Sequence, residues 1–203
     1  FYRVGKSQNS QIMHPAAEIS HPRYEVQPPR ILTKMEYRAL RDACRDDVRT
    51  HAIVELFLQT GIRIGELASL KLSSIKDKEL IVQEFENQPQ RAVPLNKAAK
   101  LAVDKWLEIR PKTESGALFI TKTGRPLLVR NIRTTIDRYF KMAGIEGAKV
   151  NDLRHTFIAH HLASGTPLTV ISKLVGHKRL STTERYLDMV KEKNIDNLKL
   201  GEL

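Results

Sequence analysis

The sequence has little of what several common protein classes require. Its 203 residues contain a single cysteine, Cys44, which excludes an internal disulfide and a cysteine-cluster zinc site. No stretch approaches the roughly 18 apolar residues that a bilayer-spanning helix needs. Because Cys44 lies in an apolar helical pattern, we expect a buried structural thiol, and an unpaired thiol fits a protein of the reducing cytoplasm.

Negative charge is scarce relative to positive charge. The 34 Lys and Arg residues outnumber the 23 Asp and Glu residues, which gives a formal net charge of +11. This excess favours a polyanionic partner, most commonly nucleic acid, and a basic protein without such a partner is the alternative. The basic residues are spread over many predicted elements and form no single amphipathic helix, so we expect no membrane partner.

The N-terminal segment differs in composition from the rest of the chain. Residues 1–30 show little apolar periodicity and contain four prolines, so we interpret them as a linker. A folded domain begins after it, where Thr33 and Glu36 predict a helix-initiating capping box. Hydrophobic residues make up 41% of the chain, which is enough for one packed core.

Apolar spacing beyond residue 31 predicts a series of helices interrupted by short strands. The sequence therefore indicates a mainly α-helical domain with a small antiparallel β-sheet, an α+β fold. The predicted helices cover residues 33–44, 50–59, 63–70, 97–109, 128–143, 152–163 and 166–175, with a last helix from residue 181. The predicted strands are a hairpin at 80–85 and 92–95, and a further strand at 117–121.

Cap residues and apolar stripes make this prediction specific. Asn96 is expected to cap the helix over residues 97–109, and Asn151 the helix that starts at Asp152. Residues 181–184 read as a second capping box, which places Tyr186 in an early turn of the last helix. The side chains predicted to face the core include Ile53, Leu56, Phe57, Ile132, Ile136, Tyr139, Phe140, Val170, Ile171 and Leu174.

Three separated segments carry residue types suited to one reaction. Taken singly, each has a commoner explanation, because such arginines are usually solvated or ion-paired and such tyrosines usually pack in a core. Taken together and in this order, from about Leu32 to Met189, they resemble the tyrosine recombinase (phage integrase) family, in particular its Xer-like site-specific recombinases. The segments are Thr60-Gly61-Ile62-Arg63-Ile64-Gly65-Glu66-Leu67, Asp152-Leu153-Arg154-His155-Thr156-Phe157, and Gly176-His177 followed after eight residues by Tyr186.

The resemblance implies a reaction and a domain organisation. Members of this family cleave DNA with a tyrosine, hold the strand as a 3′-phosphotyrosine and rejoin it through a free 5′-hydroxyl, without metal or ATP. By this resemblance, residues 31–190 form the catalytic domain and residues 1–30 link it to a missing N-terminal core-binding domain. Residues 191–203 would be a C-terminal tail exchanged between protomers through Ile195, Leu198 and Leu200.

The candidate residues also suit the reaction on physical grounds. Guanidinium groups are permanently charged and offer paired donors, so Arg63 and Arg154 are predicted to bind the phosphate and its transition state. Arg154 is expected in the first turn of its helix, where the helix dipole favours an anion. Tyr186 would be the nucleophile, and it needs a cationic pocket and a proton acceptor because a free phenol has a pKa of about 10. His177 would donate to the phosphate or accept a proton.

Two positions depart from the family pattern. The family has a His three residues before the second arginine, where this chain has Asn151, whose amide can donate to phosphate but cannot shuttle a proton. The family also has a Lys in the hairpin turn that protonates the leaving 5′-oxygen. Here that turn contains Glu86 and Arg91 and no lysine, and Lys122 in a later turn is the candidate replacement. Because of these two departures, a catalytically impaired DNA-binding relative of the family is an alternative interpretation.

The implied partner is double-stranded DNA, bound by a homotetramer with accessory DNA-bending proteins, in the cytoplasm at the nucleoid. Candidate DNA contacts are basic residues outside the apolar stripes, namely Arg130, Arg133, Lys178 and Arg179. No cofactor or metal is expected, because the sequence has neither a P-loop nor clustered carboxylates. Besides a site-specific recombinase or integrase, the open alternatives are the impaired relative, a type IB topoisomerase, and a basic interaction protein whose motif matches are coincidental.

Overall fold

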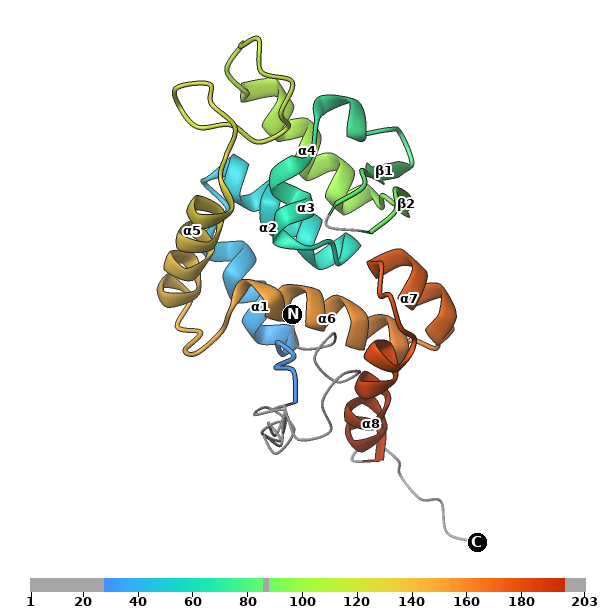
Figure 1. The fold of residues 1–203 in the computed structure, drawn as a ribbon. Helices are drawn as coiled ribbons and strands as arrows, with labels where there is room; N and C mark the ends of the chain where they lie inside the picture. The colour runs from blue at the N-terminus through green and yellow to red at the C-terminus, as the bar shows by residue number, and fades with distance from the viewer. Residues whose placement is uncertain (1–27, 86–87, 196–203) are drawn as a thin grey trace, which may run out of the picture.

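Helices make up most of the fold, and one short hairpin supplies the strands (Figure 1), as the sequence predicted. The computed structural model describes residues 28–85 and 88–195. In chain order the elements are α1 (Lys34–Ala43), α2 (Val48–Thr60), α3 (Ile64–Ser69), a 3₁₀ turn η2 (Leu72–Ser74), β1 (Glu79–Val82), β2 (Arg91–Pro94), α4 (Lys97–Ile109), α5 (Val129–Met142), α6 (Val150–Ala163), α7 (Leu168–Val175) and α8 (Ser181–Ile195).

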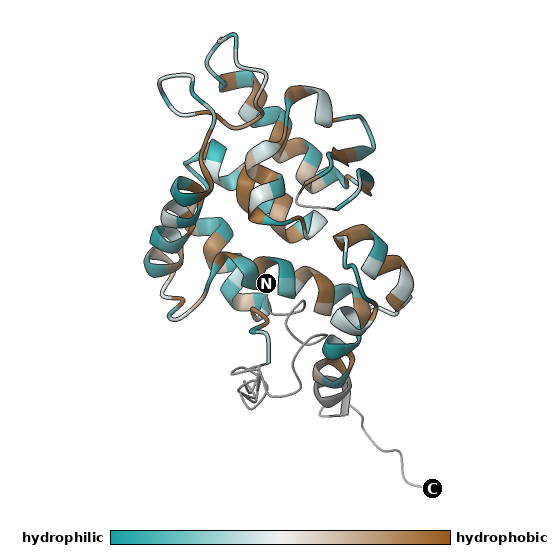
Figure 2. Ribbon diagram, in the orientation of Figure 1, coloured by the Kyte–Doolittle hydropathy of each residue, from teal (hydrophilic) through white to brown (hydrophobic). Residues whose placement is uncertain are grey.

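Helix α2 lies at the centre of the fold. It packs against α4 and α6 and also contacts α1 and α5. The predicted inward residues Ile53, Leu56 and Phe57 are all buried, and Figure 2 shows this part of the molecule as predominantly hydrophobic. Glu55 is buried there too, and the guanidinium of Arg41 on α1 donates to both of its carboxylate oxygens, at 2.5 and 3.0 Å. The buried carboxylate is therefore paired, as burial of a charge requires.

Two predicted helix starts are confirmed by side-chain hydrogen bonds. Thr33 accepts from the amide of Glu36, whose carboxylate accepts in return from the amide of Thr33 at 2.7 Å. Asn96 accepts from the amide of Ala99 at 3.0 Å and caps α4. The predicted stripe on α5 (Ile132, Ile136, Tyr139, Phe140) is buried.

The predicted hairpin forms, with β1 antiparallel to β2 and Leu80 opposite Val93. The predicted third strand at 117–121 does not. That segment makes only isolated bridges, one from Ala117 to Lys71 and one from Ile120 to Pro126. Some of its backbone carbonyls bind side chains and not a neighbouring strand. The carbonyl of Leu118 accepts from the Trp106 indole at 2.9 Å. Arg110 also donates to the carbonyls of Ala117 and Leu118, at 2.7 and 3.3 Å.

Two further sequence predictions were wrong in detail. Helix α6 begins at Val150 with Lys149 as its N-cap, because the Asp152 carboxylate accepts from the Lys149 amide at 2.7 Å, so Asn151 is not the cap. Val170 was expected to face the core but is 43% exposed.

The last helix also begins differently from its prediction. Ser181 is already the first residue of α8, because the Leu180 carbonyl accepts from the amides of Thr183 and Glu184. Ser181 is therefore a helical residue and not a cap.

The interior has two hydrophobic clusters. The larger one gathers residues from α1 to the start of α6 and includes Cys44, which is buried and free as predicted. Burial raises the pKa of the Cys44 thiol to about 12, so this thiol is unreactive. The smaller cluster joins α6, α7 and α8 and contains Phe157, Ile158, Ile171, Val175 and Tyr186. Across the described part of the chain, none of the helices combines the length and apolar character needed to span a bilayer.

The turn after α2 brings these two clusters together and offers a stability test. Gly61 has φ +60°, and a Cβ placed on it would lie 2.4 Å from a ring carbon of Phe157. Gly61→Ala should therefore lower the free energy of unfolding by more than the about 1–3 kcal/mol expected for a positive φ alone. Denaturant unfolding would measure it. Gly144→Ala (φ +69°, open space) isolates the backbone cost, and Gly116→Ala should be nearly neutral. Equal losses for Gly61 and Gly144 would contradict the contact with Phe157.

Candidate active site

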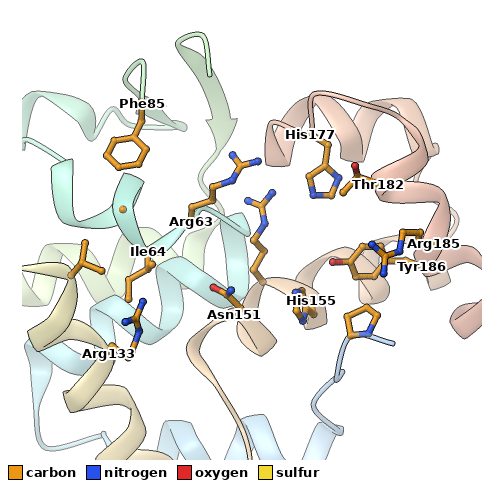
Figure 3. Close-up of a pocket in the computed structure, with 14 residues that line it drawn as sticks. Arg63, Ile64, Phe85, Arg133, Asn151, His155, His177, Thr182, Arg185 and Tyr186 are labelled. Atoms are coloured by element: carbon orange, nitrogen blue, oxygen red, sulfur yellow. The ribbon is translucent and has the colours of Figure 1, made fainter. Parts of the chain in front are cut away.

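A cavity of about 690 Å³ opens where α3, α6 and α8 approach one another (Figure 3). Four arginines and two histidines line it, and no acidic residue is among the described residues that do so. Such a pocket is an attractive site for an anion. Its lining is Pro29, Arg63, Ile64, Gly65, Phe85, Val129, Arg133, Asn151, Arg154, His155, His177, Thr182, Arg185 and Tyr186.

The two arginines from the sequence motifs meet in this cavity although they are far apart in the chain. Arg63 immediately precedes α3, and its guanidinium donates to the carbonyl of Gly176 at 2.6 Å. Arg154 projects from α6 and donates to the carbonyl of Val175 at 2.7 Å and to that of Gly61. Arg154 is the fifth residue of α6 and not, as predicted, in its first turn. Its position in the pocket therefore comes from these side-chain hydrogen bonds.

A buried carboxylate orients the first of these arginines. The side chain of Glu66 is fully buried and accepts from Arg63 at 3.0 Å and from both terminal nitrogens of Arg91 at 2.8 Å. Burial alone would raise the pKa of Glu66, but the hydrogen bonds from Arg91 and from the Arg63 amide outweigh it, so its pKa lies below the ordinary value. Glu66 therefore stays ionised and fixes the Arg63 guanidinium at the cavity wall.

The C-terminal end of α7 is held by the same arginines. The carbonyls of Leu174, Val175 and Gly176 accept from Arg91, Arg154 and Arg63, respectively. Unpaired carbonyls at a helix C-terminus carry partial negative charge, which favours cations there. These hydrogen bonds fix the backbone directly before His177, and they therefore position His177 as well.

His177 is fixed in position and uncharged. Its Nδ1 lies 2.7 Å from the hydroxyl of Thr183 in the first turn of α8. Burial, together with the positive charges of Arg154, Arg63 and Arg91, lowers the pKa of His177 to about 4. The imidazole is therefore neutral at physiological pH in the absence of an anion, and it would be available to donate from its second nitrogen.

Tyr186 comes from the early part of α8 and directs its hydroxyl into the cavity (Figure 3). Its ring belongs to the smaller hydrophobic cluster and is 6% exposed. Burial raises the pKa of its phenol, and the charges of Arg154 and Arg185 oppose that effect only in part. Arg154 in turn is buried, and burial with the like charge of Arg63 lowers its pKa to about 9, so it stays cationic at neutral pH.

The structure thus brings five of the six predicted catalytic residues to one cavity and places the sixth elsewhere. Asn151, released from the predicted cap position, lines the cavity and is exposed. Lys122 instead lines two other hollows, one with Trp106 and one with Asn131. The turn it occupies follows the bridged segment that did not become a strand. Glu86 lies outside the described residues.

Sequence reasoning missed several residues of the cavity. His155 and Arg185 directly follow or precede predicted catalytic residues, which is the signal that could have identified them. Phe85 packs over Gly65, where an added Cβ would lie 2.5 Å from its ring, and nothing in the sequence indicated that contact. Of the predicted DNA-contacting residues, Arg130, Arg133, Lys178 and Arg179 are all exposed, and Arg133 also lines the cavity.

Sequence comparison places the chain among known proteins. The model named "Phage integrase family" matches residues 30–193. The chain is 35% identical over 188 residues to the tyrosine recombinase XerC of Thermodesulfovibrio yellowstonii, covering 86% of this chain and 62% of that protein. It is 33% identical over 185 residues to XerC of Alcanivorax borkumensis, covering 85% and 60%, respectively. The chain therefore spans about three fifths of the length of these relatives.

Solved structures agree on the fold. The crystal structure of XerA recombinase matches with a TM-score of 0.77 and 26% identity, over 90% of this chain and 68% of that chain. XerH bound to a palindromic difH substrate in a post-cleavage complex matches with a TM-score of 0.72 and 19% identity, over 86% and 54%. A lambda integrase dimer bound to a COC′ core site gives 0.72 and 21%, over 91% and 55%. The last two likenesses concern the fold alone.

These matches exclude a coincidental origin of the three motifs. The family model covers the segments that carry Arg63, Arg154 and Tyr186, and relatives above 30% identity extend along most of the chain. This chain belongs to the phage integrase family.

Proposed function

We propose that the chain is the catalytic domain of a site-specific DNA recombinase or integrase. It cleaves a DNA strand through a 3′-phosphotyrosine at Tyr186 and rejoins it, in DNA integration, excision or transposition. The observation that carries the proposal is the convergence of Arg63, Arg154, His177 and Tyr186 on one cationic cavity. No metal or cofactor is needed in this scheme, because the covalent bond to Tyr186 conserves the phosphodiester energy.

The geometry suggests how each group acts. A phosphate seated in the cavity would receive hydrogen bonds from Arg63 and Arg154, since the bonds that hold these guanidiniums use only part of their donors. Neutral His177 would add a further donor to a nonbridging oxygen. The phenol of Tyr186 would then attack phosphorus, and Asn151 would contribute an amide donor at the cavity wall.

The second candidate is a DNA-binding relative with impaired cleavage. It is favoured by one observation, namely that the cations lining the cavity are arginines and no lysine is among the described residues there. An arginine is a poor proton donor to a leaving oxygen. Lys122 remains the proposed replacement only if DNA binding brings its turn to the cavity. Strand relaxation of the type IB topoisomerase kind is a third outcome, which a supercoiled plasmid would report.

Partners and domain limits follow from the same proposal. Residues 31–190 would form the catalytic domain and residues 1–30 the linker to an upstream core-binding domain. Double-stranded DNA would lie across the cavity, with a homotetramer as the working assembly and DNA-bending proteins as accessories. Backbone contacts are proposed for Arg130, Arg133, Lys178 and Arg179, because these exposed cations lie in α5 and in the loop after His177.

The nucleophile can be identified by covalent trapping. Nicked suicide duplexes drawn from candidate recombination sites should give a denaturation-resistant adduct with the unmodified chain, and Tyr186→Phe should abolish it because the attacking oxygen is gone. Gel electrophoresis of the denatured mixture measures the adduct. Tyr37→Phe, on the half-buried face of α1, is the matched control and should leave the yield unchanged. Persistence of the adduct in Tyr186→Phe would refute the assignment.

The depressed pKa of His177 predicts a pH dependence of DNA binding. A nearby phosphate should move that pKa back up from about 4, so the complex binds more protons than the free protein between about pH 4 and 6.5. DNA affinity should therefore rise as pH falls through this window, by at most about tenfold per pH unit. Fluorescence anisotropy at constant salt would measure it. His177→Gln should flatten the slope, and an unchanged slope would count against phosphate binding by His177.

The proposed tail exchange predicts an assembly defect. Leu198 and Leu200 lie outside the described residues, and α8 reaches Ile195. Removing residues 196–203 should keep α8 and DNA binding by single chains but reduce higher-order complexes on DNA. Native gels and analytical ultracentrifugation, with DNA that carries a candidate recombination site, would compare the assembly of the unmodified and truncated chains. The double substitution Leu198→Ala/Leu200→Ala is the milder variant. Undiminished assembly in both would rule out docking through the tail.

A further inference from the structure

His155 has a buried nitrogen that lacks a hydrogen-bond partner within the described structure. Its Nδ1 is fully shielded and makes no hydrogen bond. Buried polar atoms are almost always paired, so an exception calls for an explanation, often a functional one. His155 follows Arg154 in α6 and lines the candidate cavity, and about a quarter of its side chain, 25%, remains exposed. Since Nδ1 is buried, the exposed edge is elsewhere on the ring, where it can meet a group in the cavity.

The nearest acidic group to that nitrogen is the carboxylate of Asp152. Its Oδ1 lies 3.4 Å from Nδ1 of His155, and its other oxygen is fixed by the amide of Lys149 at 2.7 Å. Asp152 is itself 5% exposed, so it is both oriented and poorly solvated. A carboxylate in this position favours the imidazole tautomer with the proton on Nδ1. That tautomer leaves a lone pair on Nε2.

The ring of His155 also lies beside the nucleophile. The ring centroids of His155 and Tyr186 are 6.0 Å apart, with a tilt of 58° between the planes. Figure 3 shows both side chains entering the cavity from facing elements, α6 and α8, with the tyrosine hydroxyl directed inward. A proton transfer between the two side chains requires Nε2 of His155 to come within hydrogen-bond reach of that hydroxyl. Hydrogen bonds of this kind often tighten only when substrate is bound.

Other groups in the cavity are poorer proton acceptors. Asn151 cannot accept a proton from a phenol, because an amide oxygen is not a base in this range. His177 has one nitrogen engaged by Thr183, and burial and three neighbouring arginines lower its pKa to about 4. Burial raises the pKa of Tyr186, so the reaction needs a base beside it.

We infer that His155 is the general base for Tyr186, and that Asp152 is the positioning residue that orients it. The inference rests on the proposed function. It gives Asp152, His155 and Tyr186 the same order of roles as the acid, imidazole and hydroxyl of a hydrolase triad, at a site where the nucleophile is a phenol. It would also account for cleavage by a chain that has Asn151 where the family has a histidine.

In the proposed step, a proton moves from Tyr186 to His155 as the DNA strand is cleaved. The Tyr186 hydroxyl gives its proton to Nε2 of His155 while its oxygen forms the bond to phosphorus. The bond between phosphorus and the 5′-oxygen breaks, and that oxygen leaves and takes a proton from solvent water. The imidazolium formed on His155 is stabilised by the Asp152 carboxylate. In the rejoining step the 5′-hydroxyl gives its proton to solvent as its oxygen forms the bond to phosphorus. The bond between phosphorus and the Tyr186 oxygen breaks, and the departing phenolate recovers its proton from His155.

The test is the single-turnover rate of adduct formation on suicide DNA at saturating protein. His155→Ala should lower this rate by about 10²–10⁴-fold, the usual contribution of general acid–base catalysis. DNA affinity should change little, because His155 need not bind phosphate. His160→Ala is the matched control, since His160 is exposed on the same helix and lies outside the cavity, and it should leave the rate unchanged.

Two further arms separate a base from a structural residue or a leaving-group acid. DNA with a 5′-bridging sulfur has a leaving group that needs no protonation, so His155→Ala should remain slow on it if His155 acts on the nucleophile. His155→Gln keeps hydrogen-bonding groups and should be equally slow. Adding Asn151→His to His155→Ala places an imidazole at the neighbouring cavity position and should recover at least tenfold of the lost rate. Asp152→Asn keeps an acceptor for the Lys149 amide and should lower the rate of adduct formation by less than His155→Ala does.

The outcomes are distinct. A normal rate for His155→Ala and His155→Gln, both shown to be folded by thermal melting, would overturn the inference while leaving Tyr186 as nucleophile. Recovery of His155→Ala on the sulfur-containing DNA would also overturn it, because His155 would then act on the leaving group. Absence of any adduct from the unmodified chain on a bound target would refute the proposed function and this inference together.

Discussion

The site depends on the attachment of α7 to α3 through three arginines, two of which pair with the buried carboxylate of Glu66. Glu66 is completely enclosed and holds Arg63 and Arg91, and these two and Arg154 bind the last carbonyls of α7. A buried charge is tolerable only when it is paired, and removing one partner of such a pair costs about 3–5 kcal/mol. This network therefore holds α7 against α3 and β2, and two of its arginines, Arg63 and Arg154, line the cavity.

The same burial sets the protonation states of the groups that line the cavity. Low polarity and crowded positive charge hold His177 neutral and lower the pKa of the Arg154 guanidinium. Burial keeps the Tyr186 phenol protonated. A phosphate would reverse the balance around the arginines and His177, because its negative charge would stabilise their charged forms. The cavity is thus suited to binding an anion. In the proposed reaction, Tyr186 would still have to lose its proton before or during its attack on phosphorus.

Much of the architecture could be read from local patterns. The Thr33 capping box, the Asn96 cap and the stripe around Ile136 are consequences of hydrogen bonds and spacing within one turn or two, and the structure agrees with each. The segment 117–121 is not a strand, and side chains from elsewhere take several of its carbonyls: Trp106 and Arg110 those of Ala117 and Leu118, and Arg49 that of Ile120. Ser181 and Asn151 failed as caps because each helix start moved by one or two residues, which spacing alone does not determine.

The sequence by itself determined the family, the helical class and the identity of the motif residues, because these depend on residue type and order along the chain. Only the tertiary structure decided what each residue does with its neighbours. It placed Lys122 away from the cavity, freed Asn151 from capping, paired His177 with Thr183, and set His155 between Asp152 and Tyr186. The physical reason is that orientation, burial and the sharing of a proton depend on distances across packed elements, which no single segment encodes.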